Sequence, residues 1–192
     1  MSTLAKKIVA VHRALEKKEL PHAFGGALAL AWCTARARGT IDIDVNVFVA
    51  ASRSREVVAA MPKAVARDEA QIGTLERDGQ ARLWWDRTPI DVFLDTTPFH
   101  AQILGRRRWE TFAGEEVPFL ACQDLAVFKA FFNRTKDWAD LEEMRDAGTL
   151  EIGKVIAVLT EYLGVADERV KKLDAMREQS NDPARRSTSH GE

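Results

Sequence analysis

The sequence predicts an α/β fold (α+β type) in which a mixed sheet with flanking helices is followed by a helical part. Three observations predict it. Short apolar runs alternate with helical patterns up to about residue 121, only helical patterns follow Gln123, and one early strand carries alternating carboxylates. We therefore expect a first domain at 1–121 and a helical domain at 122–179. The tail at 180–192 has no core-forming side chains and is expected to be disordered.

Composition describes a globular chain that is neither strongly acidic nor strongly basic. Of its 192 residues 46% are hydrophobic and 30% are charged, and the formal net charge of −1 gives no global attraction to nucleic acid. No apolar run is long enough to span a membrane and no secretion signal is visible. With only Cys33 and Cys122, we expect no disulfide and a reducing, cytoplasmic location.

The chain begins with an amphipathic pattern at 3–18, which predicts a helix with Ser2 or Thr3 as its N-cap. Pro21 ends that helix, and residues 22–24 are a short strand leading to Gly25 and Gly26. His22 in that strand is expected to be structural. An Ala/Leu-rich helix that carries Trp32 follows the glycines and should be buried against the sheet.

The strand with the carboxylates is the feature around which the other elements are arranged. Side chains alternate between the two faces of a strand, so Thr40, Asp42 and Asp44 share one face. The apolar side chains of the other face are Ile41, Ile43, Val45 and Val47. Two such carboxylates repel each other unless a cation lies between them. The Thr40 hydroxyl is placed to contact a metal-bound phosphate.

The middle of the chain predicts further strands. A short helix at 54–61 and a charged, irregular region precede two strands at 82–85 and 89–95, joined by a turn whose residues are not ideal for a tight hairpin. Asp91 lies among apolar neighbours, where a carboxylate is costly to bury unless it is paired or metal-bound. A short helix at 99–104 and a hairpin at 109–120 complete this part.

The helical part carries a second group of polar residues. Leu125, Phe128 and Phe132 predict one buried stripe with Lys129 at its border, where a lysine usually extends to solvent. Asp137 and Asp140 are spaced as a capping box, which explains both without a function. Further helices are expected at 151–163, ended by Gly164, and at 167–176.

A Gly-Gly turn, a helix and an Asp-x-Asp strand at this distance resemble the signature of the nucleotidyltransferase superfamily. Over about residues 5–165 the chain most resembles the AbiEii and MenT-like nucleotidyltransferases, many of which are toxins of bacterial toxin–antitoxin pairs. The resemblance implies a polymerase β-like palm followed by a helical lobe. It also implies an enzyme that transfers a nucleoside monophosphate from an NTP to an acceptor hydroxyl.

The resemblance assigns roles to particular residues. Asp42, Asp44 and Asp91 would bind Mg²⁺, with Mn²⁺ as the alternative, and Asp91 would be a metal ligand or general base. Gly25 and Gly26 would seat the triphosphate. Lys129, in the segment LACQDLAVFK, matches a phosphate-binding lysine of this family, and Asp140 matches an aspartate that follows it.

The acceptor implied by the resemblance is RNA, in particular the 3′ end of tRNA, with an antitoxin protein as partner. The arginines that could bind an RNA backbone are Arg36, Arg38, Arg106, Arg107 and Arg108. A solvated loop is the alternative for the first two, and a solvated turn is the favoured alternative for the other three. The alternatives are a nucleotidyltransferase for an aminoglycoside-type small molecule, one for a protein acceptor, and a non-catalytic nucleotide-binding regulator.

Overall fold

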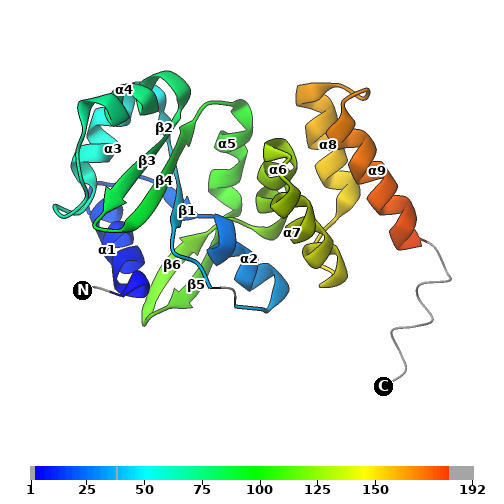
Figure 1. The fold of residues 1–192 in the computed structure, drawn as a ribbon, viewed down its shortest axis with the longest axis horizontal. Helices are drawn as coiled ribbons and strands as arrows, with labels where there is room; N and C mark the ends of the chain where they lie inside the picture. The colour runs from blue at the N-terminus through cyan, green and yellow to red at the C-terminus, as the bar shows by residue number, and fades with distance from the viewer. Residues whose placement is uncertain (1–2, 38, 182–192) are drawn as a thin grey trace. The chain divides into compact units, whose positions relative to one another are not determined.

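The computed structural model describes residues 3–37 and 39–181, so Arg38 and the tail at 182–192 lie outside the described residues. The chain forms two compact units. Of the described residues, the first contains 3–32, 36–37 and 39–121, and the second contains 33–35 and 122–181. In Figure 1 the first runs from blue to green and the second from olive to red.

A six-stranded mixed sheet is the centre of the first unit. Its strand order is β3-β4-β2-β1-β6-β5, with β2 parallel to β4, β1 parallel to β6, and the other neighbours antiparallel. The strands are β1 (His22–Phe24), β2 (Ile43–Ala50), β3 (Gln80–Trp85), β4 (Thr88–Asp95), β5 (Arg108–Phe112) and β6 (Glu115–Phe119). This confirms the expected α/β fold with a mixed sheet.

Helices cover this sheet. They are α1 (Leu4–Glu16), α2 (Gly26–Thr34), α3 (Ser54–Ala60), α4 (Glu69–Asp78) and α5 (Pro98–Ile103), with two 3₁₀ turns, η1 (Ala51–Arg53) and η2 (Leu104–Arg106). The side chain of Thr3 caps α1 by accepting a hydrogen bond from the N–H of Lys6, as expected. Figure 1 shows α3 and α4 beside the hairpin of β3 and β4.

Helix α4 was not expected, because Gly73 and the Asp78-Gly79 pair were interpreted as turn signals. The Asp68 side chain caps its start by accepting a hydrogen bond from the N–H of Ala70, 2.9 Å away. Ile72 and Leu75 are buried on one side, and Gly79 ends the helix in the left-handed conformation. The cap and the buried face offset the cost of about 1 kcal/mol that Gly73 imposes in a helix interior.

Two burial predictions near the glycines are wrong. Strand β2 begins at Ile43, so Ile41 lies outside the ladder and its side chain is 78% exposed. Trp32 is 38% exposed, and its ring lies 5.9 Å from that of Phe119 instead of being fully covered. The first error comes from continuing the alternation of the strand before its first residue, whereas Trp32 lies within α2 and is only partly covered.

The second unit is helical, as expected for the C-terminal part. Its helices are α6 (Cys122–Phe132), α7 (Thr135–Asp146), α8 (Ile152–Leu163) and α9 (Glu168–Asn181). Helix α6 packs against α7 and α8, and α8 packs against α9. Helix α9 includes residues 180 and 181, which the sequence had placed in the tail. No helix in the described ranges is long and apolar enough to cross a membrane.

The expected capping box of α7 is shifted by one turn. Arg134 is the N-cap, and Asp137 is the third helical residue, whose carboxylate accepts a hydrogen bond from the N–H of Arg134 at 3.3 Å. Asp140 therefore lies inside the helix and has no capping role. Gly164 follows α8 with a φ of +84°, as the sequence predicts for a helix end.

The two cysteines form a disulfide, which corrects the expectation of free thiols. Cys33 near the end of α2 joins Cys122 at the start of α6, with their Cα atoms 5.5 Å apart. The argument that unpaired cysteines indicate a reducing compartment therefore fails. The two residues are 89 positions apart, so sequence spacing gave no signal for the pairing.

We expect reduction of this disulfide to lower the free energy of unfolding by about 2–4 kcal/mol, because the crosslink closes a long loop in the unfolded chain. Urea denaturation with and without dithiothreitol measures the change. The double variant Cys33→Ser/Cys122→Ser should not respond to the reductant. Identical denaturation midpoints for oxidised and reduced wild type would contradict the prediction.

Candidate active site

The turn between β1 and α2 is closed directly onto Asp44. The N–H of Gly25 donates a hydrogen bond to the backbone oxygen of Asp44 at 2.9 Å. Gly26 has a φ of +54°, and a Cβ placed on it would lie 1.9 Å from Oδ2 of Asp44. A side chain at Gly26 would thus be strained and would displace the carboxylate, so the glycine is required for this approach.

Asp44 and Asp91 lie side by side in the centre of the sheet. They are register partners on the parallel strands β2 and β4. Because register partners on neighbouring strands extend from the same face, the two carboxylates flank one surface position. The structure therefore brings together the second carboxylate of the Asp-x-Asp motif, Asp91 and the glycine turn.

Asp91 also has a partner that the sequence interpretation missed. Arg82 on β3 donates from Nε and Nη2 to the two carboxylate oxygens of Asp91, each at 2.7 Å. This bond raises the pKa of Arg82 above its ordinary value, and Asp42 and Asp44 add smaller contributions of the same sign. The Arg82 guanidinium thus pairs with Asp91 and feels the charges of Asp42 and Asp44 more weakly.

A simple signal would have located Arg82. Strands β3 and β4 are joined by two residues, Asp86 and Arg87, and that register places Arg82 opposite Asp91. The residues of this turn are not ideal for a tight hairpin on sequence grounds. Asp86 adopts a positive φ of +54°, and buried Lys7 donates to the backbone oxygen of Trp85 and to the Asp86 carboxylate, which holds the turn.

Asp42 lies just before β2, one residue outside the strand in which it was expected. Its carboxylate accepts a hydrogen bond from the Thr40 hydroxyl, and the Asp42 N–H lies 3.3 Å from the same hydroxyl oxygen. This local turn explains Thr40 without a phosphate. Asp42 is nevertheless close enough to Arg82 to affect its pKa, so it belongs to the same acidic group.

The donor chemistry of these residues fits a hard divalent cation. All three side chains offer carboxylate oxygens, which are the ligands Mg²⁺ and Mn²⁺ prefer. Among the residues described, however, Asp42, Asp44 and Asp91 do not form a group whose ligand atoms all converge within 4.8 Å. The three carboxylates repel one another, and Arg82 is paired with Asp91. A bound cation would therefore have to bring the three carboxylates closer together.

We expect Arg82→Gln to tighten Mg²⁺ binding by the acidic group about two- to five-fold, because an exposed ion pair of this kind contributes about 0.2–1 kcal/mol in competition with the metal. Isothermal titration with Mg²⁺ measures the effect. Arg77→Gln is the matched control, since Arg77 is exposed on α4 and pairs with Asp78. Weaker Mg²⁺ binding in Arg82→Gln would contradict the prediction.

In the second unit, Lys129 is buried instead of lying at the border of a stripe. It is 6% exposed, and its Nζ lies 2.5 Å from Asp140 Oδ2 and 3.8 Å from Asp137 Oδ1. Asp137 is also bound by Arg134. Phe132 is 41% exposed, so the expected stripe is only partly buried. These pairs give Lys129 and Asp140 a structural role that holds whether or not they contact phosphate.

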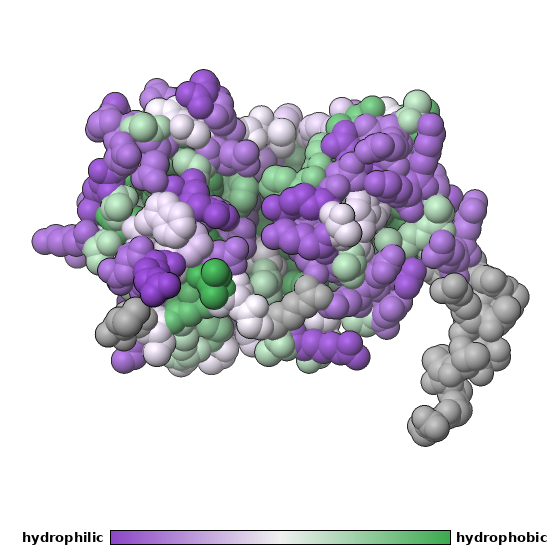
Figure 2. All heavy atoms as spheres, viewed as in Figure 1, coloured by the Kyte–Doolittle hydropathy of each residue, from purple (hydrophilic) through white to green (hydrophobic). Residues whose placement is uncertain are grey.

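The candidate RNA-binding arginines are used in different ways. Arg107 is partly buried, donates to the backbone oxygens of Leu104 and His22, and lies over the rings of Phe48 and Trp109. Arg108 pairs with Glu110. Arg36 and Arg106 are exposed, and Arg106 lies over the Phe99 ring. Figure 2 shows polar residues over most of the face in view.

The chain has the nucleotidyltransferase fold. Two solved structures of the antibiotic-resistance factor ANT(2″)-Ia match it. The solution structure has a TM-score of 0.52 at 16% identity and covers 97% of each chain. The crystal structure, in complex with adenylyl-2″-tobramycin, has a TM-score of 0.54 at 18% identity and covers 93% of this chain and 99% of that one. No family model and no curated protein sequence matches the chain.

Proposed function

We propose that the protein is a metal-dependent nucleotidyltransferase that uses an NTP. One observation carries the proposal. Asp44 and Asp91 are register partners in the centre of the sheet, and the Gly25-Gly26 turn is closed onto Asp44 with no room for a side chain. The approach of the Gly25-Gly26 backbone to the Asp44 carboxylate is suited to a site that binds a triphosphate and its cation. Two aspartates with only a structural role would not need this approach.

The proposed reaction transfers a nucleoside monophosphate from the NTP to an acceptor hydroxyl. An acceptor hydroxyl attacks the α-phosphorus of the NTP, a new P–O bond forms, and pyrophosphate leaves as the bond to the β-phosphate breaks. Asp91 takes the hydroxyl proton or passes it to solvent, while Arg82, released from Asp91, neutralises the triphosphate. Mg²⁺ bound by Asp42, Asp44 and Asp91 would supply charge neutralisation and activation of the hydroxyl.

Gly25 and Gly26 seat the phosphates in this proposal. The N–H groups at the start of α2 and the positive end of its dipole favour an anion there. Lys129 and Asp140 are proposed to belong to the phosphate-binding set, on the sequence resemblance alone. The domain limits of 1–121, 122–179 and 180–192 likewise stay a proposal.

For the acceptor we infer the 3′ end of tRNA, with a toxin role and an antitoxin protein as partner. This inference is supported by the resemblance of residues 5–165 to AbiEii and MenT-like proteins and by exposed Arg36 and Arg106. The structure reduces the support from Arg107, because that side chain is engaged in holding the backbone of Leu104 and His22.

An aminoglycoside-type small molecule is the second candidate acceptor. The observation that favours it is the similarity of the fold to ANT(2″)-Ia, whose crystal structure contains adenylyl-2″-tobramycin. A polycationic acceptor would also suit an acidic group that contains three aspartates, since opposite charges attract.

One experiment separates the acceptors. Purified protein is incubated with each of the four α-³²P nucleoside triphosphates and Mg²⁺, in separate reactions with total cellular RNA, an aminoglycoside mixture, or the protein alone. Label in a tRNA-sized band that is absent with Asp44→Asn supports the RNA acceptor. Label on an aminoglycoside or on protein instead overturns the tRNA assignment and keeps the transferase. No label in any reaction counts against catalysis.

A further inference from the structure

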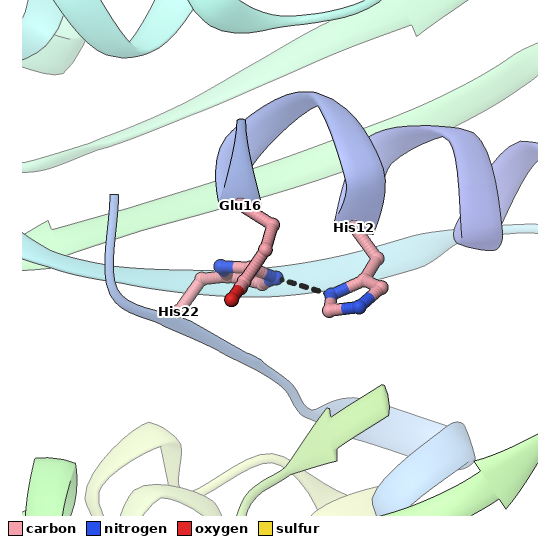
Figure 3. Close-up of side chains that lie close together, drawn as sticks. All are labelled: His12, Glu16 and His22. Atoms are coloured by element: carbon pink, nitrogen blue, oxygen red, sulfur yellow. Dashed lines mark hydrogen bonds between the residues drawn. The ribbon is translucent and has the colours of Figure 1, made fainter. Parts of the chain in front are cut away.

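Two histidines and a glutamate lie together in the first unit, away from the acidic group. His12 and Glu16 are one helical turn apart on α1, and His22 lies on β1. Their ligand atoms all lie within 4.8 Å of one another. Figure 3 shows the three side chains pointing toward a common position. The sequence had suggested only a structural role for His22.

The hydrogen bond from His22 to the backbone orients its imidazole as a metal ligand is usually oriented. Nδ1 of His22 lies 2.8 Å from the backbone oxygen of Leu20, which can only accept, so Nδ1 carries the proton. The lone pair of His22 is then on Nε2, which faces Nδ1 of His12 at 2.9 Å. A carbonyl that fixes the tautomer of a ligating histidine is a common outer-shell arrangement.

Both histidines are neutral near pH 7, as ligation requires. Burial lowers the pKa of His22 to about 4 and also lowers the pKa of His12. The two histidines are 1% and 7% exposed, whereas Glu16 is exposed, so the carboxylate is the part of the cluster that solvent reaches.

We propose that His12, Glu16 and His22 bind a transition-metal ion of the zinc class, which would clamp α1 to β1. Two nitrogen and one oxygen ligand from protein, with one position open, is a common zinc ligand set. Ligand nitrogens on tetrahedral Zn²⁺ are about 3.3 Å apart, so the 2.9 Å between the rings needs to widen only slightly. For Nδ1 of His12 to bind the ion, the ring proton would move from Nδ1 to Nε2, so that the imidazole stays neutral.

The charges around this cluster partly oppose and partly favour a cation. Arg107 donates to the backbone oxygen of His22 and disfavours added positive charge. The charge of Glu16 acts to raise the pKa of both Arg107 and His12. Glu115 also acts to raise the pKa of His12, whereas Arg13, which is paired with Glu115, acts to lower it. The carboxylates make the local balance compatible with a divalent ion.

The test uses chelator-treated, full-length protein in millimolar Mg²⁺, which occupies the acidic group. Zn²⁺ affinity is measured by competition with a chromophoric chelator, and the ligand field is measured from the visible spectrum with Co²⁺. We expect one equivalent of Zn²⁺, a tetrahedral Co²⁺ spectrum and a higher thermal midpoint with metal. Loss of an outer-shell partner weakens metal binding about 10–100-fold, and loss of a direct ligand should weaken Zn²⁺ binding at least as much.

Variants of the proposed ligands and of a control histidine test the metal site. Glu16→Gln should weaken Zn²⁺ binding at least about ten-fold and His22→Gln more, while the control His100→Gln, a buried histidine that contacts Thr97, should bind as wild type. Because the Glu16 side chain is exposed, its variant stays folded even if His22→Gln does not. No Zn²⁺ uptake by wild type, or equal uptake by Glu16→Gln and wild type, overturns the proposal. Neither result depends on nucleotidyl transfer.

Discussion

We expect Asp44→Asn to lower kcat/KM for nucleotidyl transfer by at least about 1,000-fold, because it removes a charge on which the cation depends. The amide has the shape of the carboxylate, so the packing over Gly26 is kept. A metal that acts as a Lewis acid supplies several kcal/mol of transition-state stabilisation, and about 4 kcal/mol corresponds to a thousand-fold in rate.

Asp95→Asn is the matched control for this variant. Asp95 ends the same strand that carries Asp91 but lies four residues beyond it, near His100. It should keep nearly the full rate. Equal rates of nucleotidyl transfer by Asp44→Asn and Asp95→Asn under the same conditions would contradict a metal site at Asp44.

We expect Lys129→Met to lower the free energy of unfolding by about 3–5 kcal/mol, since it leaves the buried Asp140 without its cation. Asp137 is affected less because Arg134 still binds it. Chemical denaturation followed by circular dichroism measures the loss. Lys136→Met, an exposed lysine on α7, should change stability little.

A double variant distinguishes a structural Lys129 from a phosphate-binding one. In Lys129→Met/Asp140→Leu the buried pair is replaced by apolar side chains, which often restores or exceeds the original stability. If NTP binding recovers together with stability, Lys129 acts only within the helical unit. If the double variant is stable but its KM for NTP stays raised, Lys129 contacts the phosphates. An unchanged stability of Lys129→Met would contradict the burial argument.

The parts of the fold that depend on local patterns were predictable. Helix α1, the strand before the glycines, the hairpin of β5 and β6 and the Gly164 stop follow from apolar periodicity and turn residues, and the structure confirms them. The strands β3 and β4 follow from their apolar residues, although the turn between them was predicted to be unfavourable. Helix α4 was missed because its single glycine was given more weight than its Asp68 cap. The exposure of Ile41 depends on where β2 begins, which local patterns locate poorly, whereas the exposure of Trp32 depends on how α2 packs.

The sequence identified residues of the candidate site but not the contacts that these residues make with one another. Spacing identified the glycine turn and the aspartates, but the contact of Gly26 with Asp44 depends on how β1 and β2 pair. The Arg82 partner required the register of the hairpin, and the Cys33–Cys122 bond joins residues 89 positions apart. The burial of Lys129 could not be predicted from its own helix, because its partner Asp140 lies on the next one.

The most direct test of the central claim is Mg²⁺-dependent binding of a non-hydrolysable NTP analogue, because it requires no knowledge of the acceptor. Titration calorimetry compares wild type, Asp44→Asn and Asp95→Asn, with Mg²⁺ and with a chelator. We expect wild type and Asp95→Asn to bind the NTP analogue only when Mg²⁺ is present, and Asp44→Asn not to bind it. Equal binding by all three proteins, with or without Mg²⁺, would contradict a metal-nucleotide site at Asp44.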